Sequence, residues 1–384
     1  MPVRRSKKIS HTVIRDADMQ AIATADIHLD ALDHNLATIK RLAPNSKVVA
    51  MLKANAYGHG AFTVAHHLNG AVDAYGVARI DEAIALREAG INTELVLMEG
   101  FFSADDLPLI VAHNLQIVVH SEFQLSALEA MAALTGQIQL PLKVWLKVDT
   151  GMNRLGIEPQ QFQSFYQRLR TCPVVDREIV VLSHLSSSDQ LNSDITPRQI
   201  ALFERTCTDG SFPRSLANSG AILAWPECHY QWVRPGVMLY GVNPLHPANV
   251  DDVQLKPVMT LHSSLIAVKS IQEGDSVGYG ATYTASRNTR IGVVAIGYGD
   301  GYPRHARIGT PVLVNGVRVP LVGRVSMDMI TVDLGPESNA QVGDYVELWG
   351  QNLAIEDVAA DAETIPYELL CNITARVKID VLSN

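Results

Sequence analysis

A lysine that closes an apolar run is the first residue in the chain with an evident chemical use. Lys53 follows the apolar residues 48–52 and opens the octapeptide Lys53-Ala54-Asn55-Ala56-Tyr57-Gly58-His59-Gly60. A lysine in a low-dielectric site loses its proton readily and can form a Schiff base with an aldehyde. The alternative is a lysine that simply emerges at the rim of a strand.

Other polar groups follow strand-like runs in the same way. His184 ends the run at 179–183, the segment Asn218-Ser219-Gly220 follows another run, and Arg234 precedes Pro235-Gly236. Backbone amides at the start of a helix after Asn218 could cradle a phosphate. An amine, an imidazole, a phosphate site and a guanidinium suit a phosphorylated aldehyde cofactor better than a metal. We therefore predict a cofactor site and no metal site.

The elements that must position these residues alternate between about residue 30 and residue 245. Short runs rich in Val, Ile and Leu have the length of buried strands, and the amphipathic stretches between them have the length of helices. The predicted strands are 47–53, 74–79, 94–98, 116–119, 142–148, 178–184, 215–218 and 232–239. The predicted helices include 61–68, 81–89, 122–134, 160–170 and 197–207.

Eight strands that alternate with helices predict an α/β fold with a parallel sheet, and the count suits a closed (β/α)8, TIM-like barrel. Chemistry in such a barrel gathers at the C-terminal ends of the strands, where Lys53, His184 and Asn218 fall. A doubly wound open sheet is the alternative. No G-x-G-x-x-G turn follows the first predicted strand, which weakens the dinucleotide-binding form of that alternative.

The sequence changes in character after about residue 250. The runs 261–268, 289–296, 311–314, 317–322, 329–334 and 344–348 are short and β-branched, and turn residues such as Asn315-Gly316 separate them. This pattern predicts a mostly β second domain with one late helix at 354–360. We expect a flexible N-terminal extension at 1–20, a cofactor-binding barrel at 21–247 and the β domain at 248–384.

Composition narrows the functional classes. The chain has 384 residues and a net charge of -9, which disfavours nucleic-acid binding. No stretch approaches the roughly 20 apolar residues of a membrane span, and no apolar run follows the basic N-terminus, so we expect a cytoplasmic protein without a signal peptide. The 4 cysteines are scattered without metal spacing and are expected to be buried or incidental thiols. They are Cys172, Cys207, Cys228 and Cys371.

The octapeptide at Lys53 resembles the pyridoxal-phosphate attachment motif of alanine racemases, and further motifs of that family follow in order. They are Lys147-Val148-Asp149-Thr150-Gly151-Met152-Asn153-Arg154-Leu155-Gly156, Ser183-His184, Ala217-Asn218-Ser219-Gly220, Arg234-Pro235-Gly236, Gly278-Tyr279-Gly280-Ala281-Thr282-Tyr283, Gly297-Tyr298-Gly299-Asp300-Gly301-Tyr302, Gly323-Arg324-Val325-Ser326-Met327-Asp328 and Pro366-Tyr367-Glu368. The resemblance covers nearly the whole chain after residue 20. It implies a homodimer with shared active sites that interconverts L-alanine and D-alanine with pyridoxal 5'-phosphate and supplies D-alanine for cell-wall peptidoglycan.

The resemblance also implies roles for individual residues. Lys53 would hold the cofactor and act as one catalytic base, and Tyr279 of the other subunit would act as the second. Arg154 would bind the substrate carboxylate, and Tyr298, Met327 and Asp328 would shape the substrate pocket across the interface. The residues implied to bind the cofactor are Lys53, Tyr57, His184, Asn218, Ser219, Arg234, Gly236, Val237 and Tyr367. Within that set, Arg234 would donate to the pyridine nitrogen.

Lys147 lies close in sequence to Arg154 and Asp149. The resemblance implies that Lys147 carries a carbamate, which would turn the lysine into an anion able to hold the Arg154 guanidinium bidentately. An ordinary ion pair between Lys147 and Asp149 is the alternative.

Three other functions remain open. Asn153 and Ser326 depart from the commonest family residues and could alter the shape of the substrate pocket, so a racemase acting on serine or other amino acids is the first alternative. A pyridoxal-phosphate decarboxylase of basic amino acids is disfavoured because the Gly-Gly-Gly loop is absent and only Cys371 lies in the second domain. A single-barrel cofactor-binding protein is disfavoured because such proteins lack the β domain that carries Tyr279.

Overall fold

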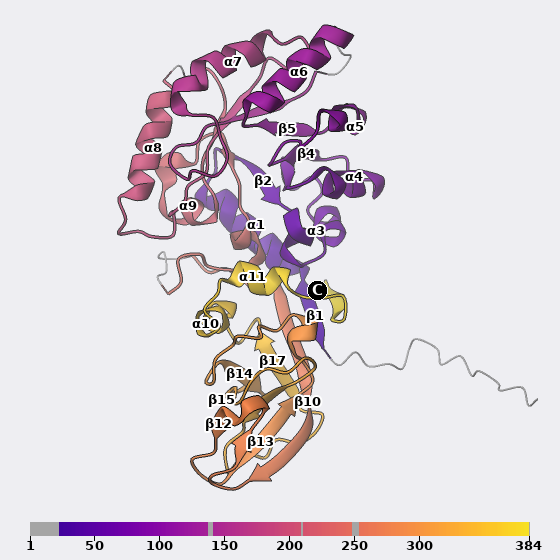
Figure 1. The fold of residues 1–384 in the computed structure, drawn as a ribbon, viewed down its shortest axis with the longest axis vertical. Coiled ribbons are helices and arrows are strands. Elements are labelled where there is room, and N and C mark those ends of the chain that lie inside the picture. The colour runs from indigo at the N-terminus through magenta and orange to yellow at the C-terminus, as the bar shows by residue number, and fades with distance from the viewer. Residues whose placement is uncertain (1–22, 137–140, 209, 248–252, 384) are drawn as a thin grey trace, which may run out of the picture.

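The computed structural model describes residues 23–136, 141–208, 210–247 and 253–383. A barrel wrapped by helices and a β domain follow one another along the long axis of the molecule (Figure 1). The expected extension at 1–20 lies outside the described residues.

Eight parallel strands close into the barrel, each paired with the next and the last paired with the first. They are β2 (Lys47–Met51), β3 (Ala74–Val77), β4 (Glu94–Leu97), β5 (Gln116–Val119), β6 (Val144–Lys147), β7 (Val180–Leu182), β8 (Arg214–Ser215) and β9 (Trp232–Val233). The register opposes Val49 to Ala74 and closes the ring with Val48 opposite Val233. The predicted closed barrel is confirmed, and the open sheet is wrong.

Helices cover the outside of the barrel with one apolar face each. In α7 (Phe162–Thr171) the buried residues Phe162, Phe165, Tyr166 and Leu169 recur at the spacing of a single helical stripe. The other covering helices are α1 (Leu29–Leu42), α3 (Ala61–His67), α4 (Ile80–Glu88), α5 (Leu107–Ala112), α6 (Glu122–Thr135), α8 (Ile195–Thr206) and α9 (Ser219–Ala224).

The predicted strand at 232–239 is wrong in its second half. β9 ends at Val233, and Gly236 has φ -107° and ψ -104°, which is not an extended conformation. Pro235 has no N–H to offer a strand ladder, and the chain then turns into the 3-10 helix η4 (Val237–Tyr240). The break brings Gly236 and Val237 to the mouth of the barrel, where a continuous strand would have carried them away.

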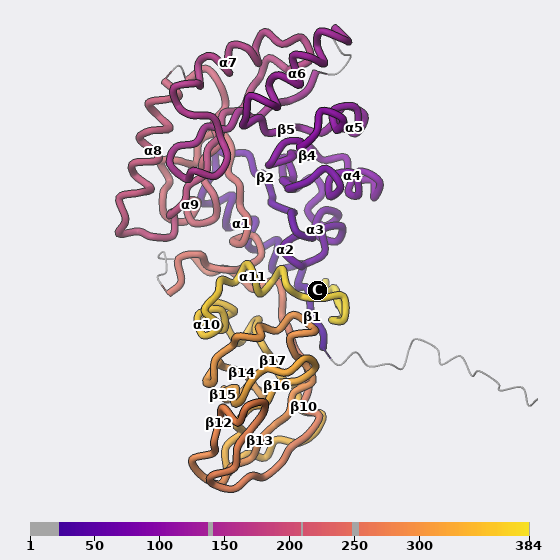
Figure 2. Tube along the Cα trace, viewed as in Figure 1, coloured from indigo at the N-terminus to yellow at the C-terminus, as the bar shows by residue number. Residues whose placement is uncertain are grey.

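The β domain matches the predicted mostly β character. Its strands are β10 (Met259–Ile271), β11 (Ser276–Val277), β12 (Tyr283–Thr284), β13 (Thr289–Val294), β14 (Pro311–Val314), β15 (Val317–Pro320), β16 (Ile330–Asp333), β17 (Tyr345–Trp349) and β18 (Lys378–Leu382). Figure 2 follows the chain through this domain. Asn315 and Gly316 both have positive φ, 49° and 80°, as a tight hairpin between β14 and β15 requires. Two helices, α10 (Ile355–Asp361) and α11 (Pro366–Cys371), lie between this sheet and the barrel (Figure 1).

One strand before the barrel belongs to the sheet of the β domain. β1 (Thr24–His28) pairs antiparallel with β10 and parallel with β18. Its Ala25 and Ile27 side chains are fully buried in that position. The expected division at residue 247 assigns β1 to the barrel, whereas its hydrogen bonds and its core contacts tie it to the other sheet.

Candidate active site

A cavity of about 620 Å³ opens at the C-terminal mouth of the barrel. Its wall brings together predicted residues that are far apart in the sequence. They are Lys53, Tyr57, Lys147, Arg154, His184, Asn218, Ser219, Arg234, Gly236, Val237 and Tyr367. Most of them follow the carboxyl end of a barrel strand, as chemistry in this fold requires.

A strained turn fixes the start of the site. Lys53 comes two residues after β2 and opens the short turn α2 (Lys53–Tyr57), in which Ala54, Asn55 and Ala56 have φ of 53°, 55° and 54°. Tyr57 continues the same left-handed conformation with φ 52°. Such a conformation costs about 1–2 kcal/mol for each residue with a Cβ, so neighbouring groups must hold it in place.

Three side chains hold that turn. A carboxylate oxygen of Glu82 accepts the Ala54 N–H at 2.7 Å, and Asn55 Oδ1 accepts the Ala61 N–H at 2.9 Å. The buried His59 donates from Nδ1 toward the carbonyl oxygens of Tyr57 and Ala56, at 2.9 and 3.0 Å. The turn therefore fixes the position of Tyr57 relative to Lys53.

The two lysines of the cavity have depressed pKa values. Burial, and then the charge of Arg154, lowers the pKa of Lys53. Burial, followed by the charges of Arg234 and Arg154, lowers the pKa of Lys147 to about 8. Burial therefore favours the neutral form of both amines, which is the form that reacts with a carbonyl carbon.

Arg234 lies almost completely buried between β7, β8 and β9. Its guanidinium donates to Ser215 Oγ at 2.6 Å and to the carbonyl oxygen of Ser183 at 2.7 Å. A third contact runs to His184 Nδ1 at 3.4 Å. Burial, and then the charge of Arg234, holds the pKa of His184 well below its ordinary value. His184 is thus neutral and can accept from Arg234.

Another part of the cavity wall forms a small polar cradle. Ser219 Oγ accepts the N–H groups of Gly236 at 2.9 Å and Met238 at 3.2 Å. A Cβ on Gly236 would lie 2.6 Å from the hydroxyl oxygen of Tyr57, so only glycine allows this approach. The ring centroids of Tyr57 and Tyr367 lie 6.0 Å apart beside this cradle. Hydroxyls and amides here, with the Lys53 amine and the Arg234 guanidinium, fit a phosphorylated aldehyde such as pyridoxal 5'-phosphate.

Four predicted residues do not join this cavity within one chain. Tyr279 lies on η5 (Tyr279–Ala281) of the β domain and is 69 % exposed. Tyr298 and Met327 are 40 % and 52 % exposed, and Asp328 is exposed beside them. Among the described residues of a single chain, none of these four lines the cavity at Lys53.

The alternative ion pair of Lys147 is not formed. Asp149 Oδ1 accepts the N–H groups of Gly151 at 2.9 Å and Asn153 at 3.1 Å, so this carboxylate organises its own loop. Asn153 has φ 55°, which explains a residue type that tolerates the left-handed region at this position. Within the described part of the chain, no carboxylate forms an ion pair with Lys147.

Comparison with known proteins gives the family. Residues 27–244 match the family described as alanine racemase, N-terminal domain, and residues 258–381 match alanine racemase, C-terminal domain. The chain belongs to the alanine racemase family. It is therefore an enzyme of the isomerase class.

Relatives of this family resemble the chain over nearly its whole length. An alanine racemase of Vibrio vulnificus (strain CMCP6) is 52 % identical over 93 % of this chain and 98 % of its own. The crystal structure of the biosynthetic alanine racemase from Pseudomonas aeruginosa has a TM-score of 0.89 and 43 % identity, and covers 95 % of this chain and 100 % of its own. An alanine racemase structure from Bartonella henselae with covalently bound pyridoxal phosphate has a TM-score of 0.85 and 29 % identity, over 94 % and 100 %.

The sequence analysis of this racemase-family chain missed two titratable residues of the cavity. Glu99 lies two residues after β4, and Cys371 ends α11. The strand-end rule that selected Lys53 and His184 also points to Glu99, so the signal was available in the sequence. Cys371 could not be found in the same way, because it reaches the barrel mouth from the second domain.

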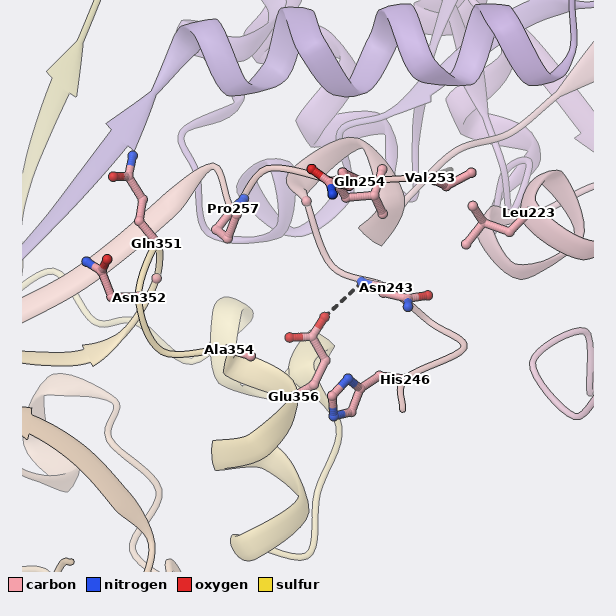
Figure 3. A pocket seen from close by; sticks show the side chains of 13 residues that line it. Leu223, Asn243, His246, Val253, Gln254, Pro257, Gln351, Asn352, Ala354 and Glu356 are labelled. Atoms are coloured by element: carbon pink, nitrogen blue, oxygen red, sulfur yellow. Dashed lines mark hydrogen bonds between the residues drawn. The ribbon is translucent and has the colours of Figure 1, made fainter. Parts of the chain in front are cut away.

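A second cavity lies apart from the cavity at Lys53. It has a volume of about 460 Å³ and lies between α9, the segment that joins the barrel to the β domain, and the loop before α10. The Glu356 carboxylate accepts the Asn243 N–H across it at 2.8 Å (Figure 3). None of the predicted site residues lines it. Among the described residues there is no cluster of three or more metal-ligating side chains, and none of their helices is both long and apolar enough to cross a membrane.

Proposed function

We propose that this chain interconverts L-alanine and D-alanine with pyridoxal 5'-phosphate, in a homodimer whose two active sites each use residues of both subunits. The observation that carries the proposal is the convergence, in one cavity, of a lysine with a lowered pKa, a hydroxyl and amide cradle and a buried guanidinium. Membership of the alanine racemase family supports the reaction type and the substrate.

The cofactor would be held at three places. Lys53 would attach its aldehyde carbon, Tyr57, Ser219, Gly236 and Tyr367 would hold its phosphate, and Arg234 would donate to its ring nitrogen. Asn218, Val237 and His184 would complete the wall around it. The chemistry that bound pyridoxal 5'-phosphate supplies is an electron sink for the charge left when the α-proton departs.

The chain's own residues would choose the substrate and move the proton. The Arg154 guanidinium would bind the carboxylate of alanine. Lys53 Nζ would take or return the α-proton on the face of D-alanine, and the Tyr279 hydroxyl of a second copy would do so on the face of L-alanine. One base on each face is the simplest way to invert the α-carbon.

A second copy of the chain is proposed because the first lacks one base. Tyr279 is exposed on the β domain and does not line the cavity of its own chain. Exposed Tyr298, Met327 and Asp328 belong to the same domain and would close the substrate pocket from the partner side. A homodimer would thus complete two sites at once.

Arg234, which contacts His184, would keep the ring nitrogen of the cofactor unprotonated. Burial lowers the pKa of Arg234 only to about 10, so the guanidinium stays protonated at neutral pH. A ring nitrogen that faces this donor receives a hydrogen bond without gaining a proton. We infer that this limits side reactions such as transamination, and replacing Arg234 with Glu is expected to increase them.

Lys147 is proposed to carry a carbamate. Two observations support the modification: its pKa of about 8 leaves part of the amine neutral, and Asp149 is engaged in its own loop. The resulting anion would face Arg154 across the cavity. The proposed cellular role is the cytoplasmic supply of D-alanine for peptidoglycan.

Hydrogen exchange coupled to chirality tests the reaction. The purified protein is incubated with L-alanine in deuterated water, and loss of the α-proton is followed together with formation of D-alanine. Exchange with inversion supports racemisation with a base on each face, whereas exchange without inversion removes the role of Tyr279. Exchange with serine but not with alanine keeps the mechanism and changes the substrate. No exchange with any amino acid contradicts the proposed function.

A further inference from the structure

An arginine near the end of the chain joins two loops that carry predicted substrate residues. Arg376 Nε forms an ion pair with Asp300 Oδ1 at 3.1 Å, and Arg376 Nη2 forms one with Asp328 Oδ1 at 2.8 Å. Asp300 ends η6 (Tyr298–Asp300), and Asp328 follows Met327. One guanidinium therefore bridges the loop of Tyr298 and the loop of Met327.

Backbone contacts show how closely these segments fit. The Tyr298 and Gly299 N–H groups donate to the carbonyl oxygens of Ser326 and Met327, at 3.0 and 2.8 Å. Thr374 Oγ donates to the Gly299 carbonyl oxygen at 2.9 Å. A Cβ on Gly299 would lie 2.5 Å from Arg376 Nη1, so glycine makes room for the guanidinium.

The two carboxylates differ in their surroundings. Asp300 is 5 % exposed, and its second oxygen accepts the Gly297 N–H at 2.9 Å. Asp328 has 55 % of its side chain exposed on the face that carries Tyr298 and Met327. A bare carboxylate there would repel the carboxylate of an amino-acid substrate, and the guanidinium that Asp328 shares with Asp300 offsets part of that charge.

We propose that Arg376 is a positioning residue that fixes Tyr298, Met327 and Asp328 as one wall of the substrate pocket and offsets part of the charge of Asp328. The inference rests on the proposed function, in which these three residues face the substrate bound by the partner subunit. The ion pairs of Arg376 do not include the Tyr279 segment, whose Gly278 and Gly280 lie against Arg324. Loss of Arg376 therefore affects substrate binding more than proton transfer.

Steady-state racemisation of L-alanine by holoenzyme tests this role. R376Q is expected to raise KM about tenfold while kcat changes less than about threefold, because the wall is displaced but both bases remain. R376K keeps the positive charge but lacks the planar guanidinium, so its KM is expected to lie between those of the wild type and R376Q. R318Q is the matched control, since Arg318 forms an exposed ion pair with Asp357 at 3.3 Å in the same domain.

Each outcome decides the matter. A higher KM for R376Q than for R318Q, with partial rescue in R376K, supports the role of Arg376. Equal KM values for R376Q and R318Q overturn it, as does a parallel loss of kcat and melting temperature without a change in KM. If R376Q does not fold, D300N/R376Q removes the unpaired buried carboxylate and is judged by the same KM criterion.

One further variant separates this inference from the proposed function. M327A alters the wall directly. A change in KM for M327A but not for R376Q or D300N/R376Q overturns the role of Arg376 and leaves the racemase proposal standing. An unchanged KM for M327A overturns both the pocket assignment and the inference. A wild-type enzyme without racemisation of alanine overturns the proposed function and this inference together.

Discussion

At the scale of single residues, the charge balance of the cavity is uneven. Among its described lining residues, the basic side chains are Lys53, Lys147, Arg154 and Arg234, and Glu99 is the only carboxylate. The charge of Glu99 raises the pKa of Lys53 and of Lys147, against the larger effect of burial. Glu99 therefore opposes the neutral form of both amines.

Neutralising Glu99 is expected to favour the carbamate on Lys147. A neutral amine adds carbon dioxide and releases one proton, so a lower pKa increases the fraction that reacts at pH 7. E99Q is expected to raise carbamate occupancy a few-fold at limiting carbon dioxide. Carbon-13 NMR of protein equilibrated with labelled bicarbonate measures that occupancy.

D149N is the control for this prediction. The Asp149 carboxylate is used by Gly151 and Asn153, so D149N is expected to leave carbamate occupancy as in the wild type. If D149N raises the occupancy and E99Q does not, Lys147 pairs with Asp149 after all. A complete lack of signal in the wild type as well would mean that Lys147 is unmodified.

His59 makes the stability of the site depend on pH. Burial lowers the pKa of this histidine to about 4, below its ordinary 6.5. Because the pKa of His59 is lower in the folded state, the unfolded chain binds a proton at His59 between about pH 4 and pH 6.5, and the folded chain does not. The stability contribution is complete above about pH 6.5 and is lost as the pH falls toward 4, by on the order of 3 kcal/mol.

Unfolding by urea at pH 7 and pH 5 tests the role of His59. The wild type is expected to lose more stability between these pH values than H59Q, which has no titrating ring at this position. H67Q is the control, since His67 pairs with Asp33 at the surface. Equal pH dependence in wild type and H59Q would show that His59 contributes nothing to it.

Sequence reasoning found most of the site residues that one chain brings together. Lys53 and His184 follow from strand ends alone, because a barrel collects such residues at one mouth. Tyr279 could be assigned only by family resemblance, since its own chain leaves it exposed on the other domain. Glu99 was missed although it lies two residues after β4, where the same strand-end rule applies.

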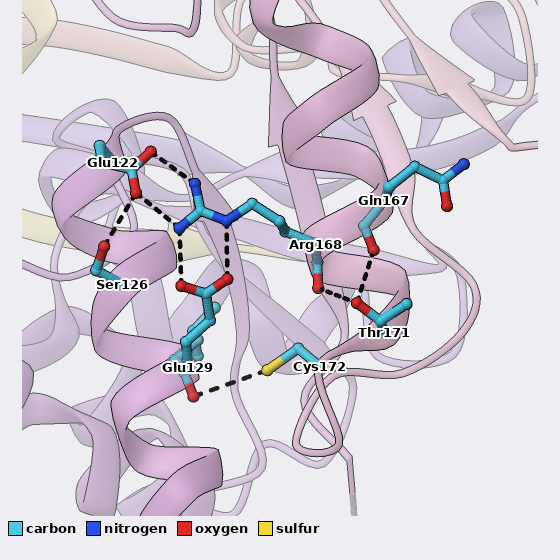
Figure 4. Close-up of polar contacts among 8 residues, drawn as sticks. Glu122, Ser126, Glu129, Gln167, Arg168, Thr171 and Cys172 are labelled. Carbon is cyan, nitrogen blue, oxygen red and sulfur yellow. Dashed lines mark hydrogen bonds and ion pairs between the residues drawn. The ribbon is translucent and has the colours of Figure 1, made fainter.

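At the scale of elements, an ion-pair cluster joins two neighbouring helices. Arg168 of α7 donates to Glu122 and Glu129 of α6, with closest distances of 2.7 Å to each (Figure 4). Hydrogen bonds from Arg168 lower the pKa of both glutamates. The cluster lies on the outer face of the barrel, so solvent and salt weaken it.

Removing Arg168 is expected to cost a small amount of stability. R168Q should lower the melting temperature by about 2–4 °C at low salt, which corresponds to about 1 kcal/mol. The glutamate pKa values are depressed in the folded state, so this stability is present above about pH 4.3 and is lost as the pH falls below it. Melting curves in low and high salt and at acid pH measure the effect.

R170Q is the matched control for the cluster. Arg170 lies two residues further along α7 and stacks over the Tyr166 ring. R170Q is not expected to share the salt dependence of R168Q. If R168Q melts like the wild type in low salt, the cluster does not stabilise the contact between α6 and α7.

Element prediction worked best where periodicity was long and failed where the chain leaves a regular ladder. Helices such as α6 and α8 lie within two residues of the predicted ranges. The predicted strand at 232–239 includes most of η4, whose residues are apolar. Composition alone cannot distinguish an apolar strand from an apolar 3-10 helix. Pairing of β1 with β10 and β18 could not be read at all, because it joins segments from opposite ends of the chain.

At the scale of the whole molecule, a shared active site predicts complementation. K53A and Y279F are each expected to be inactive alone, since one lacks the cofactor lysine and the other the second base. After subunits are exchanged by mild denaturation, the mixed dimer carries one intact site out of two. Activity of about one quarter of the wild type is expected for random reassociation of equal amounts.

The outcome of the mixing experiment distinguishes two arrangements. Recovered activity means that Lys53 and Tyr279 of different chains serve one site. A mixture that stays inactive, although size analysis shows mixed dimers, means that each chain supplies both of its own bases. A Y279F enzyme that is active alone means that Tyr279 is not used.

The position of β1 decides the order in which the parts can be completed during synthesis. β1 is made early, yet it lies between β10 and β18 and pairs Thr24 with Lys378, near the other end of the chain. On the ribosome, the barrel can form while β1 remains without its partner β18 for roughly tens of seconds at ordinary rates of translation. The β domain is thus finished last, and a fragment starting at residue 248 would lack an inner strand of its sheet.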